Sequence, residues 1–472
     1  MNLVVFSGGT ATNSLTPSFY NLTVSKGHEL TYVLPISDNG GSTSEILRVL
    51  GGPAIGDIRS RIVRLLEDEK LVIVFGYRLS EDCHEAKREW NEIVEGTHQV
   101  WKAVPQEVKE MCRAFIIHIN SELLKKSKSY ANRFKFEKAS IGNLFLTGAR
   151  LFLGSLDASI ELMMRIGRCN PKVNVIPCIN TSHTHHISAL LTNGDVITGQ
   201  SQISHPSKPS VNRAASRHGT LMNEEQDLFE NSLNAGSNYM DGMNKGGTIA
   251  IGPSAENSMV EEQGGAETEE EEEYANPIYI LPELKNSQLH FDKCDSDEML
   301  PAPIRRILYI NPYGEEIKPL GNSRAVSKIK EADMIVYSIG SLMTSLMPII
   351  ILGNIASTIL DCPKKHKILI INNKYDRETF GHDAYHYVKM VVESMTRAVM
   401  NYRQTRGIVA STLKNLKWDC FITDIIYLTG GDIQMDWGSL SEHNIVCHGI
   451  NSDKLSNEDL EVVLKKIHSL ST

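Results

Sequence analysis

The chain has 472 residues, so one large domain with insertions and two separate domains are both compatible with its length. Its formal net charge of −9 excludes a nucleic-acid-binding surface as the main function, because such surfaces carry an excess of Lys and Arg. The acidity comes from one tract, since removing eight glutamates from −9 leaves about −1 for the rest of the chain. These are Glu261, Glu262, Glu267 and Glu269 to Glu273.

The cysteine pattern indicates a reducing compartment. Eight cysteines are scattered singly, without a C-x-x-C pair or a compact disulfide spacing, and this usage predicts no zinc site. The first residues, MNLVVFSGGT, have no basic leader and too short an apolar run for a signal peptide. We therefore expect a cytoplasmic location.

The first 75 residues alternate between apolar runs and polar loops that contain glycine. Leu3 to Phe6, Glu29 to Ile36 and Leu71 to Phe75 are each predicted to form a strand. Strands that alternate with helices at this spacing predict an α/β fold with a parallel, doubly wound sheet. In such sheets ligands bind beyond the carboxyl ends of the strands, which is where the loops SGGT and SDNGGS fall.

The region from about 78 to 138 is predicted to be a helical insertion. Within it Val108, Met111, Phe115, Ile119 and Leu123 recur at helical spacing, which indicates an amphipathic helix that packs on the core as a cap or lid. The next segment, SIGNLFLTGARLFL, is expected to form an apolar helix with its first serine as the N-cap.

Residues 205 to 277 interrupt the ordered pattern. Ser, Asn, Gly, Met and Glu dominate there without a sustained period, which predicts a disordered insertion. Its Glu run is interpreted as a solvated surface, with a docking tail for a basic partner as the alternative. Ordered segments resume near Ile304 and continue through Lys367 to Asn372. Residues 1–472 are therefore expected to form a single domain that contains both insertions.

One long apolar segment has to be considered as a membrane span. Met334 to Leu360 comprises 27 residues without a charge. Polar residues interrupt it, and it breaks at Ile339-Gly340-Ser341. A buried strand (MIVYSI), a Gly-Ser turn and a buried helix (TSLMPIIILGNI) explain the segment better. We expect no membrane partner.

Two loops near the N-terminus have the composition of anion-binding sites. Gly8, Gly9 and Thr10 follow a strand, so their loop can direct N–H groups and a helix dipole at a phosphate, with an ordinary tight turn as the alternative. The loop is neither a G-x-G-x-x-G fingerprint nor a Walker lysine motif. Asp38 ends the second strand and could bind a ribose, but Asn39 and the Gly-Gly-Ser after it favour metal or phosphate binding.

A second acidic position, Asp57, lies in the motif GDIRSR beside Arg59 and Arg61. A helix N-cap with solvated arginines would explain this motif alone, but two such loops in one short segment favour a functional site. Carboxylates among Gly, Ser and Arg suit a divalent ion that bridges phosphates, or a hydroxyl that must lose its proton. Another Gly-Ser loop, from Ile339 to Ser345, separates a strand from a helix. Three helix N-termini facing one crevice would hold a diphosphate.

Two groups of histidines are not predicted to bind metal. His183, His185 and His186 are close together in the sequence, and His382 precedes His386 by four residues. Neither group has an accompanying acid at the spacing of zinc proteases.

Six motifs occur in the order typical of one known family. SGGTATNSL, SDNGGSTSEILR, GDIRSR, SIGNLFL, LLTNGDVITGQSQI and ADMIVYSIGSLMTSLMP together resemble the 2-phospho-L-lactate transferase-like (CofD-like) family, which also includes the bacterial gluconeogenesis factor, a binder of nucleotide sugars. The motifs run from Leu3 to about Tyr385 and skip the helical and acidic insertions. The resemblance implies a Rossmann-like three-layer fold, and the Ser- and Glu-rich insertion indicates a eukaryotic, fungal-type member.

The resemblance also implies roles for particular residues. In the transferases a deazaflavin hydroxyl attacks the lactyl phosphate of a guanylylated donor, with Mg²⁺, and GMP is expelled. Asp38 and Asp57 match the acidic positions associated with the metal and the acceptor hydroxyl, and with Arg59 they are the expected catalytic residues. The expected ligand-binding residues match the phosphate and acceptor loops, the Asn of the GNL motif and the Gly-Ser of the late loop. They are Gly8, Gly9, Thr10, Gly40, Gly41, Ser42, Asn143, Gly340 and Ser341.

The chain departs from the family's motifs at three places. Asn39 replaces a second acid, which removes a charge that could bind metal. The late loop has Ser338, Ile339 and Met343 where the family has Gly, Pro and Tyr. Gln200 replaces the acidic residue that follows the D-G turn between two strands.

Two functions remain open on this basis. One is an enzyme that moves a phosphate-linked group from a nucleotide diphosphate-type donor to a hydroxyl acceptor with Mg²⁺, favoured by retention of Asp38, Asp57 and Arg59. The other is a non-catalytic regulator that binds a nucleotide sugar and resembles the gluconeogenesis factor, favoured by Asn39. In both cases the expected partner is a nucleotide-derived small molecule, with no nucleic acid and no membrane. Formation of a homodimer is left open.

Overall fold

The computed structural model describes residues 1–8, 11–37, 40–127, 133–204, 299–311, 313–407 and 416–470. All of the described elements belong to one compact unit, which comprises residues 1–207 and 273–472. The tract at 205–277, which was predicted to be a disordered insertion, lies outside the described residues.

A seven-stranded parallel sheet forms the centre of this unit, in the order β11-β10-β9-β8-β1-β2-β3. From β1 the chain adds β2 and β3 on one side of the sheet and later adds β8 to β11 on the other. This arrangement confirms the predicted doubly wound α/β fold. The strands are β1 (Leu3–Phe6), β2 (Leu30–Leu34), β3 (Val173–Pro177), β8 (Met334–Tyr337), β9 (His366–Ile370), β10 (Asp424–Leu428) and β11 (Val446–Ile450).

The central strands are continuous apolar runs because both of their faces are buried. Every residue of β1, β2 and β8 is buried. Strand β1 pairs on both sides, with Leu3 opposite Leu30 of β2 and Met334 of β8. The predicted strands at Leu3 to Phe6 and Glu29 to Ile36 are confirmed.

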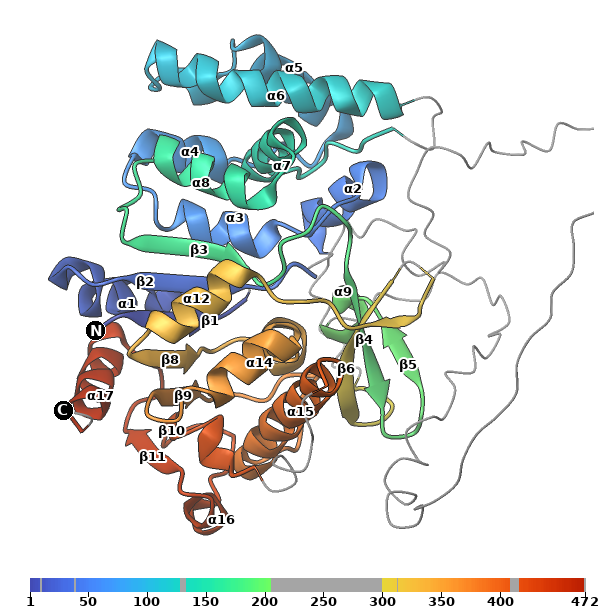
Figure 1. Ribbon diagram of the computed structural model, residues 1–472. Coiled ribbons are helices and arrows are strands. Elements are labelled where there is room, and N and C mark those ends of the chain that lie inside the picture. The colour runs from blue at the N-terminus through green and yellow to red at the C-terminus, as the bar shows by residue number, and fades with distance from the viewer. Residues whose placement is uncertain are drawn as a thin grey trace, which may run out of the picture. The chain divides into compact units, whose positions relative to one another are not determined.

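Helices flank the sheet. In Figure 1, α12, α14 and α15 lie in front of it, and α3 with α8, α4 with α7, and α5 with α6 are stacked outward beyond β3. The helices are α1 (Thr16–Leu22), α2 (Gly41–Leu50), α3 (Gly56–Val63), α4 (Glu69–Gly76), α5 (Cys83–Glu95), α6 (Gln106–Lys126), α7 (Ile141–Leu153), α8 (Leu156–Ile166), α9 (Gln200–Ser204), α12 (Ser323–Glu331), α13 (Met347–Ile350), α14 (Gly353–Leu360), α15 (Ala384–Gln404), α16 (Trp437–Glu442) and α17 (Asn457–Ser469).

The strand predicted at Leu71 to Phe75 is wrong, because this segment lies in helix α4. Asp68 caps the helix by accepting hydrogen bonds from two backbone N–H groups of its first turn. The buried side chains are Leu71, Val74 and Phe75, at helical spacing, whereas Ile73 is 60% exposed. A short apolar run does not by itself distinguish a strand from a buried helix.

The amphipathic helix predicted between 78 and 138 is confirmed as α6, but its core-facing side is rotated from the predicted one. The buried residues are Cys112, Ile116, Ile119 and Leu123. Met111, which was expected on this side, is 49% exposed. The helical spacing of the buried residues was therefore predicted correctly. At the start of the helix, however, the buried residue is Cys112, one position after the predicted Met111.

A second sheet, which was not predicted, has four antiparallel strands in the order β5-β4-β6-β7. They are β4 (His186–Leu191), β5 (Val196–Thr198), β6 (Ile304–Ile310) and β7 (Glu316–Ile317). Strands β4 and β6 precede and follow the tract outside the described residues, and they pair with each other. The chain on both sides of that tract therefore belongs to one sheet.

The uncharged segment from Met334 to Leu360 forms strand β8, a π-helical turn η5 (Leu342–Leu346), and helices α13 and α14, in agreement with the predicted strand, turn and helix. No single helix within the described ranges is long and apolar enough to cross a membrane. Leu342–Ile350 and Gly353–Leu360 meet that criterion only together, as a pair bent by 75°.

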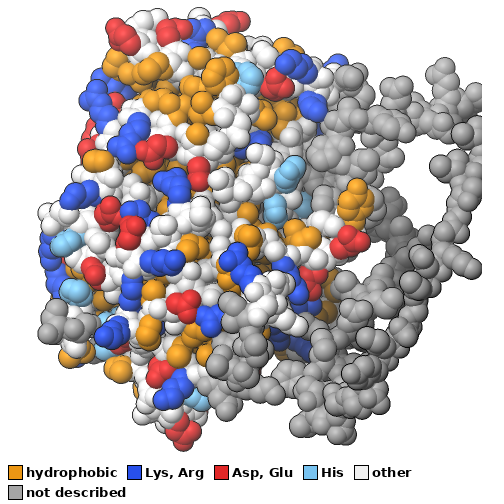
Figure 2. Space-filling view, in the orientation of Figure 1, with side chains coloured by type: hydrophobic (Ala, Val, Ile, Leu, Met, Phe, Trp, Pro, Cys, Tyr) orange, Lys and Arg blue, Asp and Glu red, His pale blue; other side chains and the backbone are white. Residues whose placement is uncertain are grey.

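On the face shown in Figure 2, hydrophobic side chains gather over the upper helices, and charged side chains of both signs are interspersed below them. The large exposed apolar side chains of α4, α6 and α7 include Ile73, Met111 and Phe152. Nothing in the structure tests whether a second copy covers them, so homodimer formation stays a prediction.

Candidate functional site

The candidate site lies at the carboxyl ends of β1 and β8, where the strand order of the sheet reverses direction. Hydrogen bonds join the loops that follow these two strands. The Ser338 N–H donates to the Phe6 carbonyl oxygen at 3.0 Å, and the Thr12 hydroxyl donates to the Ile339 carbonyl oxygen at 2.7 Å. Thr12 belongs to the short 3₁₀-helix η1 (Ala11–Leu15). Phe6 and Thr12, which lie before and after the first predicted loop, therefore contact the chain at Ser338 and Ile339, where the third predicted loop (Ile339 to Ser345) begins.

Three segments meet at Gly8. A methyl group added to Gly8 would lie 2.6 Å from Cβ of Ser345 and 3.1 Å from Oδ2 of Asp57, which leaves no room for a side chain. Asp57 lies in the first turn of α3 and is 8% exposed, and Ser345 lies in η5. The structure thus brings together two predicted site residues, Gly8 and Asp57, with Ser345, which was not among them.

Arg59, Asn143 and Ser42 form a second polar cluster. The Asn143 Nδ2 group donates to the hydroxyl oxygens of Ser42 at 3.0 Å and Thr43 at 3.4 Å. Arg59 Nε donates to Asn143 Oδ1 at 3.2 Å. These hydrogen bonds join the first turn of α2, which begins at Gly41, to α3 and α7.

The glycine of the GNL motif is explained by close packing at the start of α7. A methyl group on Gly142 would lie 2.4 Å from the Phe75 carbonyl oxygen and 2.9 Å from Cδ of Arg59. The predicted N-cap is confirmed, because Ser140 Oγ accepts a hydrogen bond from the Asn143 N–H at 3.4 Å. Asn143 is therefore held from its backbone as well as from its side chain.

The two arginines of GDIRSR have different roles. Arg61 is 1% exposed, donates from Nη1 to the Thr16 hydroxyl at 2.7 Å, and stacks 4.4 Å from the centre of the Tyr32 ring. Arg61 therefore has a structural role, in which it joins α3 to α1 and β2. Burial, and next the nearby Arg78 charge, lower the pKa of Arg59 to about 10, so that Arg59 stays cationic at neutral pH.

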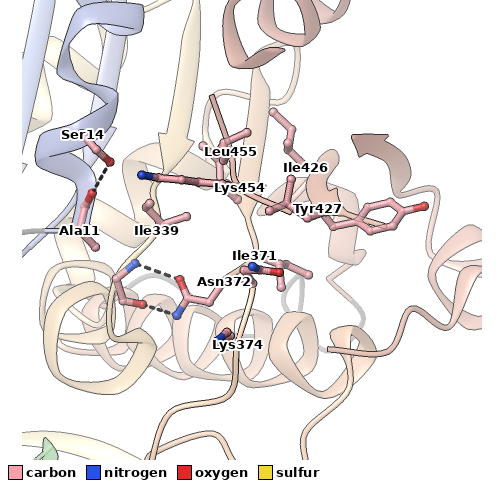
Figure 3. Close-up of a pocket in the computed structure, with 14 residues that line it drawn as sticks. Ala11, Ser14, Ile339, Ile371, Asn372, Lys374, Ile426, Tyr427, Lys454 and Leu455 are labelled. Carbon is pink, nitrogen blue, oxygen red and sulfur yellow. Dashed lines mark hydrogen bonds between the residues drawn. The ribbon is translucent and has the colours of Figure 1, made fainter. Parts of the chain in front are cut away.

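A cavity of about 370 Å³ adjoins the first and third loops on the side of β9 and β10 (Figure 3). Its walls include Ile339, Ile371 and Leu455, and two lysines, Lys374 and Lys454, also line it. In Figure 3 the Lys454 side chain extends toward the 3₁₀-helix η1, on the side of Ala11 and Ser14. Apolar walls with a few polar groups are usual for sites that bind small molecules.

The cavity reaches the third loop at Gly340. The Gly340 N–H donates to Asn372 Oδ1 at 3.1 Å, and Asn372 Nδ2 donates to the Gly340 carbonyl oxygen at 2.7 Å, as the dashed lines in Figure 3 show. A methyl group on Gly340 would lie 3.7 Å from the Gly8 carbonyl oxygen. Gly340 is therefore the point at which the cavity meets the Gly8 loop.

One buried carboxylate beside the third loop was not predicted. Glu378 is 3% exposed and accepts hydrogen bonds from the Ser341 hydroxyl, the Thr344 hydroxyl at 2.9 Å and the Met343 N–H at 3.2 Å. Burial, and next the charge of Asp376, raise its pKa, and the hydrogen bonds from the hydroxyls oppose this shift. A single acid in a polar loop gives no sequence signal for such a position.

Four predicted or discussed positions, Gly9, Thr10, Asp38 and Asn39, lie outside the described residues, and their roles stay predictions. Within the part of the chain that the structure describes, no group of three or more His, Cys, Asp or Glu side chains is placed to hold a metal ion. Asp57 can supply one carboxylate, and Mg²⁺ commonly combines one or two protein carboxylates with substrate phosphates and water. A Mg²⁺ held by Asp57 and a bound phosphate stays a prediction.

The fold and the converging loops define a doubly wound α/β protein with its candidate site where the strand order reverses. The sequence model of the family described as 2-phospho-L-lactate transferase CofD matches residues 3–425, nearly the whole chain, and the chain belongs to this CofD family. The family expected from the sequence motifs is therefore confirmed.

Several relatives agree with this placement. The uncharacterized protein YNL011C of Saccharomyces cerevisiae is 62% identical over 468 residues, which cover 99% of each chain, as expected for a fungal-type member. A Thermotoga maritima protein named "Putative gluconeogenesis factor" is 26% identical over 201 residues, which cover 41% of this chain and 62% of that protein. The crystal structure of a UPF0052 family member from Bacillus halodurans matches with a TM-score of 0.55 over 98% of this chain and 99% of that one, at 15% identity. That likeness concerns the fold alone.

Proposed function

We propose that the chain is a transferase-like protein that moves a phosphate-linked group from a nucleotide diphosphate-type donor to a hydroxyl acceptor with Mg²⁺. The observation that carries this proposal is the meeting of Gly8, Asp57 and Ser345 close to the cluster of Arg59 and Asn143. A carboxylate, a cation and closely packed loop backbone are the groups that phosphoryl-transfer sites combine. Membership of the CofD family supports the same class of reaction.

The cavity is assigned to the nucleoside part of the donor. Apolar side chains such as Ile339, Ile371 and Leu455 suit the flat faces of a base, and Lys374 and Lys454 offer positive charge to a phosphate. From this cavity a diphosphate would extend past the Gly340 loop toward Gly8. The donor would thus occupy the carboxyl edge of the sheet, as ligands do in doubly wound proteins.

Asp57 and Arg59 are assigned to the reacting end of the donor. Arg59 would neutralise charge that develops on the transferred phosphate, because its guanidinium stays protonated in this partly buried position. Asp57 would accept the proton of the acceptor hydroxyl or hold Mg²⁺ against the phosphate. Asn143 would keep Arg59 in place through the hydrogen bond to Nε.

A regulator that binds a nucleotide sugar without turnover is the second candidate. The contacts of the third loop favour it, since the Ser341 hydroxyl and the Met343 N–H are hydrogen-bonded to Glu378. A phosphate that approached these groups would have to share them with a carboxylate. The Thermotoga maritima relative has the name "Putative gluconeogenesis factor", the group that this second candidate resembles.

A thermal-shift screen tests both candidates. The chain would be heated with GDP, UDP, ADP and UDP-glucose, each with and without MgCl₂, as wild type and as Asp57→Asn. If the chain is the proposed enzyme, one nucleotide should raise Tm, and MgCl₂ should enlarge this shift. In Asp57→Asn the additional Tm shift produced by MgCl₂ should be lost. A shift that is independent of MgCl₂ and unchanged in Asp57→Asn would contradict the enzyme and support the regulator. No shift with any nucleotide would contradict both.

A further inference from the structure

Glu378 accepts a hydrogen bond from the backbone at the N-terminal end of the π-helical turn η5. The Met343 N–H donates to Glu378 Oε2 at 3.2 Å, and the next three N–H groups donate to the hydroxyl or carbonyl oxygen of Ser341. All of the N–H groups of residues 343 to 346 therefore have acceptors within the protein. Of these four groups, the Met343 N–H is the one that contacts the carboxylate of Glu378.

Three hydroxyl groups from two segments converge on the same carboxylate. Ser341 and Thr344 belong to the third loop and its turn, and Ser204 is the last residue of α9. The Thr344 and Ser204 hydroxyls contact Glu378 Oε1, and the Ser341 hydroxyl contacts Oε2. These groups and the Met343 N–H can all act as donors, and the two oxygens of the Glu378 carboxyl group can accept from them.

The segment that carries Glu378 is itself anchored on both sides. Asp376 Oδ1 accepts hydrogen bonds from the N–H groups of Glu378 at 3.1 Å and Thr379 at 2.9 Å. The Tyr387 hydroxyl of α15 donates to Thr379 Oγ1 at 2.6 Å. Arg377 Nη1 donates to a carbonyl oxygen at the end of α9 at 3.0 Å. These hydrogen bonds hold in place the backbone segment that carries Glu378.

We propose that Glu378 is a positioning residue, which holds the first turn of η5 so that Ser345 is fixed against Gly8 and Asp57. Ser345 directly follows Thr344, whose hydroxyl binds Glu378, so a shift of that turn moves Ser345 as well. The contact between Ser345 and Gly8 leaves too little space for an added methyl group, and a small displacement would therefore change it. The consequence for ligand binding rests on the proposed function, whereas the effect on the turn does not.

Two substitutions of Glu378 separate its geometry from its charge. Glu378→Ala removes every acceptor. Glu378→Gln keeps one carbonyl oxygen for the Met343 N–H, and its NH₂ group can donate to hydroxyls that rotate to accept. Glu393→Gln is the matched control, because Glu393 lies on α15 with its side chain 59% exposed.

Hydrogen exchange of the ligand-free, full-length chain tests the positioning itself. In Glu378→Ala the amides of residues 342 to 347 should exchange at least about tenfold faster, because the turn loses its hydrogen bonds to the Glu378 side chain. Glu378→Gln should stay within about threefold of wild type, and Glu393→Gln should be unchanged. Wild-type exchange in Glu378→Ala would overturn the proposal. If circular dichroism shows that this variant does not fold, Thr344→Val takes its place, with faster exchange expected and unchanged exchange again overturning the proposal.

Calorimetric titration with GDP and UDP-glucose, in the presence of MgCl₂ and well below Tm, tests the consequence for the site. The affinity should fall at least about tenfold in Glu378→Ala and stay within about threefold in Glu378→Gln. A lower Tm without any change of affinity would show a merely structural role and overturn the proposal. If the wild type binds neither probe, the proposed function fails for these ligands, and the exchange measurement still decides the role of Glu378.

Discussion

At the scale of single residues, Gly8 is a position of the candidate site that has no room for a side chain. Its neighbours come from α3 and from η5, so the tight contact depends on two segments that are remote in the sequence. Strand β1, which precedes Gly8, is fully buried without any contribution from Gly8. The core therefore does not need a side chain at this position. A small substitution should therefore affect the site more than the core.

Gly8→Ala should weaken nucleotide binding by about tenfold or more. The new methyl group would lie 2.6 Å from Cβ of Ser345, so Ser345 would have to move. The double variant with Ser345→Gly should recover most of the affinity, since Ser345 Cβ is the atom in conflict. Calorimetry on the single and double variants measures this coupling. Equal affinity in the wild type and Gly8→Ala would contradict the geometry.

Asn143→Ala should lower the free energy of unfolding by about 2 kcal/mol, because the 1% exposed amide makes hydrogen bonds to two hydroxyls and to Arg59. Urea denaturation measures the change. The exposed Asn91→Ala on α5 is the control and should stay within about 0.5 kcal/mol. Similar values for the two variants would show that the Asn143 cluster contributes no stability.

At the scale of elements, α4 shows how a short apolar run can be mistaken. Ile73→Lys should cost less than about 0.5 kcal/mol, because that side chain is exposed, whereas Val74→Lys should cost about 3 kcal/mol or more. A strand would reverse this order, since it would place residue 73 on the same face as Leu71 and Phe75. Urea denaturation of the two variants distinguishes the cases.

Strand β4 begins with His186, which is 3% exposed, and burial lowers its pKa to about 4, with a smaller effect from His185. The unfolded chain takes up a proton below about pH 6.5 while the folded chain does not, so stability should fall between pH 6.5 and pH 4. The loss from this group is about 3 kcal/mol.

His186→Gln should flatten that part of the pH profile relative to the wild type. Chemical denaturation at a series of pH values between 7 and 4 measures the slopes. The same slope in the wild type and His186→Gln would contradict the role given to His186.

At the scale of the whole molecule, the parts of the fold that could be predicted were those whose burial leaves a direct trace in the sequence. Strands β1, β2 and β8 are buried on both faces and therefore read as uninterrupted apolar runs. The second sheet left no comparable trace, because its strands depend on pairing between segments far apart in the chain. The phase of α6 was missed for a similar reason, since the surface it contacts decides which side is buried.

The residues of the candidate site also divide into those that the sequence could indicate and those that it could not. Gly8, Asp57, Arg59 and Asn143 were predicted because their motifs combine Gly, Ser, Arg and acids at the ends of strands or the starts of helices, and their roles stay predictions. The position of Glu378 beside the site could not be predicted from the sequence. Its contacts are with residues that are remote in the chain, such as Ser204, 174 positions away. Such a contact follows from the tertiary fold and from no local pattern.

The central claim, that the crevice between the loops after β1 and β8 binds a nucleotide, is tested most directly by a crystal structure of the chain with MgCl₂ and the nucleotide that gives the largest thermal shift. The account predicts that the base lies in the cavity beside Ile339 and Leu455, with the phosphates next to Gly340 and Gly8. A nucleotide bound elsewhere on the molecule, with this crevice empty, would contradict it.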